Sequence, residues 1–122
     1  MKKGEVRFIG TVTKVIGEIS TIKIDPEYCE GLERLDKYKT INILYWFHQR
    51  DNDKHRNVLK VIPRRHGDTE YRGVFASRSP SRPNPIGLTE VELITIDDCI
   101  LTVKGLDAFE ESPIVDIKPN RV

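Results

Sequence analysis

The stretch TINILYWF (residues 40–47) is an apolar run of strand length in the first half of the chain. A run of this length without helical spacing is typical of a strand that is buried on both faces. His48 and Gln49 follow it directly, at the point where such a strand emerges from the core. We therefore expect a central strand over residues 40–47 whose polar end lines a cavity, with His48 able to hydrogen-bond a ligand or to move a proton near neutral pH.

Period-two apolar patterns on both sides of this run predict further strands, and long helical spacing is almost absent. Residues 86–96 and 100–105 flank a turn at 97–99 and are expected to form a hairpin. Residues 26–35 alone show the spacing of a short helix. We predict an all-β, mainly antiparallel fold, a small closed or partly closed β-barrel with one short helix, in a single domain over residues 1–122. The other expected strands run from Val6 and Phe8 toward Val12 and over residues 19–24, 58–62, 73–76 and 114–117.

Composition indicates an ordinary globular protein, with 38% hydrophobic and 32% charged residues in 122. No apolar run approaches the roughly 18 residues that span a bilayer, and no apolar segment follows the basic start Met1-Lys2-Lys3. We therefore expect no membrane association and a cytoplasmic location. Cys29 and Cys99 show no metal-ligand or redox spacing, so they are expected to be buried free thiols, and no metal site is predicted.

The net charge of +1 conceals an uneven distribution of charge along the chain. Residues 48–88 carry nine Lys and Arg against four Asp and Glu, whereas residues 89–122 carry three against eight. The basic part also contains all three histidines. A concentration of positive charge in a nearly neutral protein favours an anionic partner, most commonly nucleic acid. The alternative is that the acidic end of the chain folds against the basic part and neutralises it.

The segment from Arg72 to Leu88 contains three arginines, three prolines and two glycines in seventeen positions. Each proline restricts its own φ and that of the residue before it, so the segment is stiff before any ligand arrives. A stiff loop that carries guanidinium and amide groups loses little entropy on binding an anion or a polar cofactor. Arg78, Arg82, Asn84 and Gly87 together therefore indicate a binding site rather than a simple surface connection.

Two carboxylates near the end of the chain also lie beside apolar residues. Asp107 follows an expected strand and offers either a ligand-binding carboxylate or a solvated turn residue. Asp116 and Lys118 lie on the same side of an extended segment, where a structural ion pair is expected. The chain has no Walker or Rossmann glycine loop, no nucleophile elbow and no paired metal histidines, so catalysis would rest on positioning two substrates.

The sequence resembles the TsaA-like family, whose characterised members are tRNA methyltransferases of the TrmO type. The resemblance lies in YWFHQ (45–49), in GVFASRSP (73–80) running into RPNPIGL (82–88), and in LD (106–107) followed by PIVDIKP (113–119). It implies a β-barrel that binds S-adenosylmethionine, commonly as a homodimer, and that methylates N6 of threonylcarbamoyladenosine at position 37 of tRNA. The residues that it implies around the cofactor are His48, Gln49, Arg78, Leu88, Leu106, Asp107 and Ala108.

By the same resemblance, Arg82 and Asn84 shape the pocket or meet RNA, and His48 and Asn84 are the predicted catalytic residues. S-adenosylmethionine brings its own electrophile, so the protein must mainly orient the substrates and help to remove the N6 proton, a role for His48. Two alternatives stay open. One is a binding module with reduced catalysis, because residues 12–21 lack a cofactor-contacting loop of the bacterial members. The other is a methyltransferase for a different acceptor. The predicted phosphate contacts are Arg56, Arg64, Arg65 and Arg82.

Overall fold

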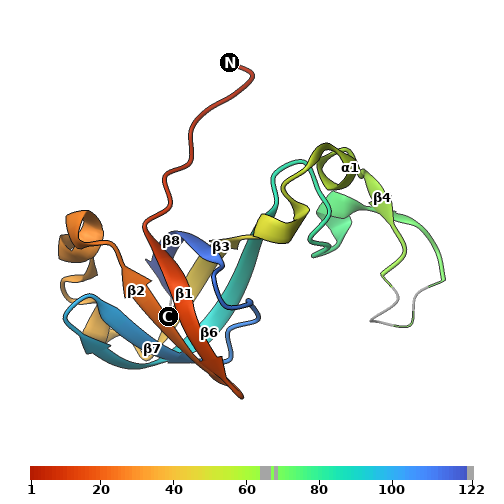
Figure 1. The fold of residues 1–122 in the computed structure, drawn as a ribbon. Coiled ribbons are helices and arrows are strands. Elements are labelled where there is room, and N and C mark those ends of the chain that lie inside the picture. Colours follow the sequence, from red (N-terminus) through yellow and green to blue (C-terminus); the bar gives the residue numbers. More distant parts are fainter. Residues whose placement is uncertain (64–66, 68, 121–122) are drawn as a thin grey trace. The chain divides into compact units, whose positions relative to one another are not determined.

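A computed structural model describes residues 1–63, 67 and 69–120 of the chain (Figure 1). The chain divides into two compact units. The first, residues 1–46 with 88–122, is called the barrel unit here, and the second, residues 47–87, is called the inserted unit. The inserted unit is therefore one continuous excursion of the chain between two parts of the barrel unit.

The barrel unit is a closed antiparallel barrel with the strand order β1-β2-β7-β6-β3-β8, in which β8 pairs back onto β1. Closure leaves no unpaired strand edge, which removes a template for aggregation. The predicted all-β barrel is confirmed. Its strands are β1 (Gly10–Ile16), β2 (Ile19–Ile24), β3 (Thr40–Trp46), β6 (Ile86–Asp97), β7 (Ile100–Lys104) and β8 (Pro113–Pro119).

The core of the barrel consists of β-branched and leucine side chains from alternate strand positions. In β3, Ile41 and Ile43 are fully buried, while the alternate residues Asn42 and Leu44 are only half-buried. The expected strand over residues 40–47 is confirmed, but the expectation that both its faces are buried is wrong, because a strand in a barrel wall turns only one face inward. The fully buried residues include Val12, Ile22, Ile24, Leu101, Val103 and Ile114.

The predicted hairpin of β6 with β7 is confirmed, β1 and β2 form a second one, and each turn has a residue with left-handed backbone. Gly17, at φ 58°, joins β1 to β2, and Asp98, at φ 57°, joins β6 to β7. Gly10 at the start of β1 is required for a different reason, since a Cβ there would overlap the backbone of β2 at Lys23 and Ile24. The paired strands at this point approach too closely for any side chain.

Two predicted elements of the barrel unit differ from the structure. The N-terminal strand begins at Gly10, and Phe8, 42% exposed, instead lies against Trp46 with a ring-centroid distance of 5.5 Å. The expected helix over residues 26–35 is a pair of 3-10 turns, η1 (Pro26–Leu32) and η2 (Leu35–Lys37), because Arg34 between them adopts a left-handed φ of 70°. A helix cannot continue through such a residue.

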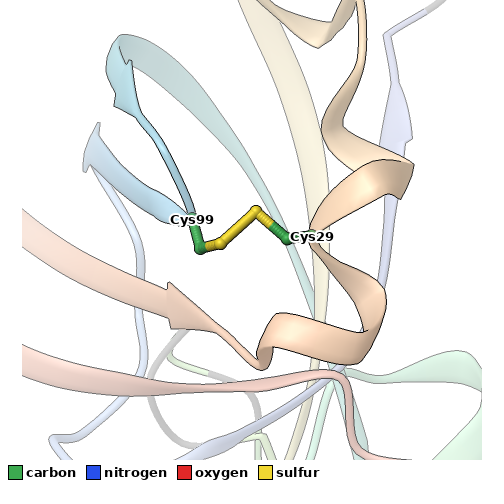
Figure 2. Close-up of a disulfide and its surroundings, with 2 residues drawn as sticks. All are labelled: Cys29 and Cys99. Carbon is green, nitrogen blue, oxygen red and sulfur yellow. A yellow bond between two sulfur atoms is a disulfide. The ribbon is translucent and has the colours of Figure 1, made fainter.

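Cys29 and Cys99 form a disulfide, so the prediction of two free thiols is wrong (Figure 2). Cys29 lies in η1, which follows β2 directly, and Cys99 lies in the turn between β6 and β7. The backbone N–H of Ile24, at the end of β2, donates to the Cys99 carbonyl over 2.8 Å. This contact brings the turn beside the start of η1, and the two Cα atoms lie 5.3 Å apart, within bonding range of a disulfide.

The inserted unit contains short elements joined by turns. Strands were expected over 58–62 and 73–76, but the observed pair is limited to β4 (Lys60–Val61) and β5 (Arg72–Gly73). Residues 74–76 form a 3-10 turn, η5 (Val74–Ala76), in which the Ser77 N–H donates to the Val74 carbonyl. The remaining elements are η3 (His48–Arg50) and the unpredicted helix α1 (Asp53–Arg56).

Across the described residues, no helix is both long and apolar enough to cross a membrane.

Candidate functional site

In the barrel unit, the hydroxyl of Tyr45 links two of the predicted cofactor segments. It lies 2.6 Å from the backbone carbonyl of Asp107, to which it donates, and 3.1 Å from the hydroxyl oxygen of Thr89. Thr89 is the neighbour of Leu88 in β6, and Asp107 lies in the turn region after β7. The end of β3, at Tyr45, therefore links the start of β6 to the 106–108 segment.

The surfaces of these barrel residues suit a mixed apolar and polar ligand. Leu88 is 45% exposed although it is a large apolar residue, and Ala108 beside Asp107 is half-buried. Leu106 is buried and anchors its segment in the core. The group thus presents accessible aliphatic surface at Leu88 and an exposed carboxylate at Asp107.

In the inserted unit, η3 and the proline loop (residues 77–85) are joined at two places. The backbone N–H of Phe47 donates to the Pro85 carbonyl over 2.7 Å, so the chain enters and leaves the unit at the same point. The Arg50 guanidinium donates to the Ser81 hydroxyl over 3.0 Å. His48 and Gln49, the other members of η3, are therefore held beside the loop that carries Arg78.

The proline loop is braced by hydrogen bonds within itself. Arg82 Nη1 donates to the backbone carbonyls of Ser77 and Ser79, each over 3.2 Å. The N–H of Ser79 donates to the Ser77 hydroxyl, and the N–H of Ser81 donates to the Ser79 hydroxyl. The loop is thus rigid through these bonds as well as through its prolines. Arg82, predicted to shape the pocket or to contact RNA, has an internal structural role in this loop.

Arg56 fixes the second half of the loop to α1. Its Nε donates to the Pro83 carbonyl over 2.8 Å, its Nη1 to Asp51 over 2.9 Å and its Nη2 to the Asn84 side chain over 3.4 Å. The side chain of Asn84, predicted to be catalytic, is exposed and oriented by this arginine. Three N–H groups of Arg56 therefore donate to acceptors inside the unit. The phosphate contact expected for Arg56 stays a prediction.

The structure thus groups the predicted site residues by unit. Leu88, Leu106, Asp107 and Ala108 gather near Tyr45 in the barrel unit. In the inserted unit, His48 is half-buried, whereas Gln49 and Arg78 are exposed. Arg64 and Arg65, predicted to contact phosphate, lie outside the described residues. The predicted ion pair of Asp116 with Lys118 is present at 3.4 Å on the surface of β8.

The sequence interpretation missed four residues that organise the site. Tyr45 looked like one more apolar member of the central strand. Its alternation with Ile43 indicates which face of the strand it lies on, but not which groups its hydroxyl contacts. Arg50 and His55 counted only toward the basic part of the sequence, and Ser81 only toward the proline-rich segment. One local signal was present for α1, since Asn52 is a strong N-cap residue, and its side chain accepts from the His55 N–H over 3.0 Å.

His55 is the described residue with a resolved electrostatic perturbation. Partial burial, followed by the positive charges of Arg50 and Lys54, holds the pKa of its imidazole below the ordinary 6.5. Both causes disfavour the protonated ring. His55 is therefore neutral at physiological pH.

The protein is a small closed antiparallel barrel whose chain carries an inserted unit with a cationic, proline-rich loop. Residues 11–121 match the family model described as the tRNA-methyltransferase O N-terminal domain. The chain belongs to this family, as the motifs of the proline loop indicated.

Curated relatives and solved structures are similar over most of the chain. The "Probable S-adenosyl-L-methionine-binding protein" of Methanothermobacter thermautotrophicus is 48% identical over 102 residues, which are 84% of this chain and 69% of that protein. The "S-adenosyl-L-methionine-binding protein" of Archaeoglobus fulgidus is 46% identical over 100 residues, 82% of this chain and 68% of that protein. A crystal structure of TrmO is 27% identical, with a TM-score of 0.76, over 98% of this chain and 58% of that one.

A second solved structure, TrmO from Pseudomonas aeruginosa, has a TM-score of 0.74 at 24% identity and supports the fold. The chain spans about two-thirds of the length of the two curated relatives and 58% and 57% of the two solved chains. The predicted cofactor, S-adenosylmethionine, agrees with the names of the curated relatives.

Proposed function

We propose that this chain is an S-adenosylmethionine-dependent methyltransferase that methylates N6 of threonylcarbamoyladenosine at position 37 of tRNA. The observation that carries the proposal is the pair of pre-built segments that match the family motifs. The Tyr45 hydroxyl holds the backbone of Asp107, and internal hydrogen bonds hold the loop that carries Arg78. A cofactor that supplies its own electrophile needs this kind of prior order more than it needs an added reactive group.

The proposed cofactor residues divide by chemistry. Leu88 and Ala108 offer apolar surface for the adenine and the methionine chain, and the buried Leu106 holds their neighbour Asp107 in place. Asp107 offers a carboxylate to ribose hydroxyls or to the amino group. Arg78 is proposed to bind the carboxylate of the methionine moiety. His48 and Gln49 complete the set, with His48 as the proposed acceptor of the N6 proton and Asn84 as the amide that orients the base.

The proposed RNA surface is the inserted unit. Residues 47–87 carry nine Lys and Arg against four Asp and Glu, so this unit attracts a polyanion. Anticodon-loop bases are splayed and accessible, and a small domain can reach one through backbone contacts and stacking. Phosphate contacts are proposed for Arg56, Arg64, Arg65 and Arg82, and the active form is proposed to be a homodimer, as in the resemblance.

Calorimetry with cofactor-free protein tests the first part of this proposal. We expect saturable binding of S-adenosylmethionine and a loss of about tenfold or more for Arg78→Ala, the loss expected for one charge-assisted hydrogen bond. Arg7→Ala is the matched control, because Arg7 is also exposed but lies in the N-terminal segment before β1. No binding at millimolar ligand, or equal losses for the two variants, would contradict the proposal.

Methyl transfer to tRNA separates the proposal from its two alternatives. Radiolabelled methyl groups are expected to enter tRNA that carries threonylcarbamoyladenosine and not tRNA that lacks it. Cofactor and RNA binding with no transfer would support the binding-module alternative. Transfer to tRNA lacking this nucleoside would support a different acceptor. Sedimentation of the purified protein tests the homodimer, which is refuted by a monomer at the concentrations that give activity.

A further inference from the structure

Three side chains of the inserted unit form a compact hydrogen-bonded cluster. His55 Nδ1 lies 2.8 Å from the Ser81 hydroxyl oxygen, which lies 3.0 Å from Arg50 Nη1, and Arg50 Nη1 lies 3.3 Å from His55 Nδ1. Ser81 is 7% exposed and is the most buried polar residue of the proline loop. The cluster joins η3, α1 and the loop in one place.

The direction of these hydrogen bonds follows from the donors available. A guanidinium group can only donate, so Ser81 Oγ accepts from Arg50 and its own hydrogen is left for His55. With Nδ1 as the acceptor, the proton of the neutral ring is on Nε2. The longer contact from Arg50 to Nδ1 favours this arrangement, because the guanidinium can only donate and Nδ1 is then its acceptor as well.

The charges around the ring favour the same state. Arg50 on η3 and Lys54 on α1 act on His55, and the loop contributes the neutral Ser81. The neighbouring carboxylate of Asp51 is paired with Arg56 at 2.9 Å. A protonated His55 would therefore meet two cations and would lose its acceptor site for Ser81.

We propose that His55 is a positioning residue whose Nδ1 acceptor holds the proline loop, through Ser81, in the conformation that binds the cofactor. This inference rests on the proposed function, since it assigns to the loop the binding of S-adenosylmethionine through Arg78. Protonation of Nδ1 removes the acceptor for the Ser81 hydroxyl and weakens the link between α1 and the loop. Because the perturbed ring titrates below pH 6.5, cofactor affinity is expected to be constant above that pH and to fall as the pH drops below it.

Two substitutions distinguish the acceptor from the rest of the ring. In His55→Asn, the amide oxygen stands near the position of Nδ1 and does not titrate. In His55→Gln, the polar group stands near the position of Nε2 instead. We expect S-adenosylmethionine affinity within about threefold of wild type for His55→Asn and about tenfold weaker for His55→Gln at pH 7.5. Ser81→Ala is expected to resemble His55→Gln.

The pH profile provides the readout that a purely structural role would not move. The wild type is expected to lose affinity between pH 7.5 and 5.5, and His55→Asn is expected to lose distinctly less over the same range. The slope that remains in His55→Asn measures the contribution of all other groups. Equal slopes in the two proteins, or His55→Gln binding as tightly as wild type, would overturn the inference. Thermal unfolding of each variant identifies any that fail to fold.

A long-range proton–nitrogen spectrum of the histidine rings tests the tautomer without any ligand. The proton of His55 is expected on Nε2, and a proton on Nδ1 would overturn the inference whatever the cofactor does. Hydrogen exchange at the Ser81 amide is expected to be faster at pH 5.5 than intrinsic rates explain, in wild type but not in His55→Asn. If wild-type protein binds no S-adenosylmethionine at all, the proposed function fails, and these two measurements still decide whether His55 holds the loop.

Discussion

Removing the Cys29–Cys99 disulfide is expected to lower the free energy of unfolding by about 4 kcal/mol. The two cysteines are 70 residues apart, and in the chain-entropy treatment a cross-link that closes a loop of this length restricts the unfolded chain by about that amount at 25 °C. The unfolded state is where the effect arises, because the barrel already holds η1 and the β6–β7 turn together in the folded protein. For 122 residues, the unfolding midpoint is expected to fall by roughly 15 °C.

The assay compares wild type with the double variant Cys29→Ser, Cys99→Ser in guanidinium chloride, with and without reductant. Reductant is expected to bring the wild type to the stability of the variant and to leave the variant unchanged. These are the two cysteines of the sequence, so thiol titration under denaturing conditions should find none in the unreduced protein. Two titratable thiols, or a difference in unfolding free energy below about 1 kcal/mol, would refute the reasoning.

Other substitutions test the barrel. Gly10→Ala places a Cβ against the Lys23 carbonyl oxygen, where neither backbone can move without breaking strand pairs, and is expected to cost about 2 kcal/mol in denaturant unfolding. Tyr45→Phe removes a donor at 2.6 Å and is expected to cost about 1–2 kcal/mol and to weaken S-adenosylmethionine binding in calorimetry, whereas loss of stability alone would argue against a role in the site. Ser20 is 1% exposed, and its hydroxyl has no hydrogen-bond partner among the described residues, so Ser20→Ala is expected to raise the free energy of unfolding by about 1 kcal/mol.

The positions of most strands follow from local pattern. The apolar run at 40–47 and the turns at Gly17 and Asp98 correspond to β3 and to two hairpins, because alternation and turn chemistry act over a few neighbouring residues. The proline-rich loop is similar, since proline restricts its own φ wherever it stands. The family motifs in this loop carried the functional expectation.

The sequence pattern and the structure disagree over the helix at 26–35 and over the two cysteines. Helical spacing over 26–35 did not anticipate the left-handed Arg34, and the spacing of Cys29 and Cys99 contained no information about their distance in space. Arg56 illustrates the same limit for the site. Its sequence context suggested a phosphate contact, which stays a prediction, but did not indicate its hydrogen bonds to Pro83 and Asn84, which arise from packing of α1 on a loop some 27 residues away.

The sequence by itself determined the strand-forming segments, the stiff cationic loop and the family, because each depends on the chemistry of residues next to one another. The disulfide, the link from Tyr45 to the backbone of Asp107 and the contact of His55 with Ser81 come from the tertiary structure. Those features depend on which atoms meet after the barrel closes and the inserted unit folds. Closure of the barrel depends on all of its strands together, and no single stretch of sequence encodes it.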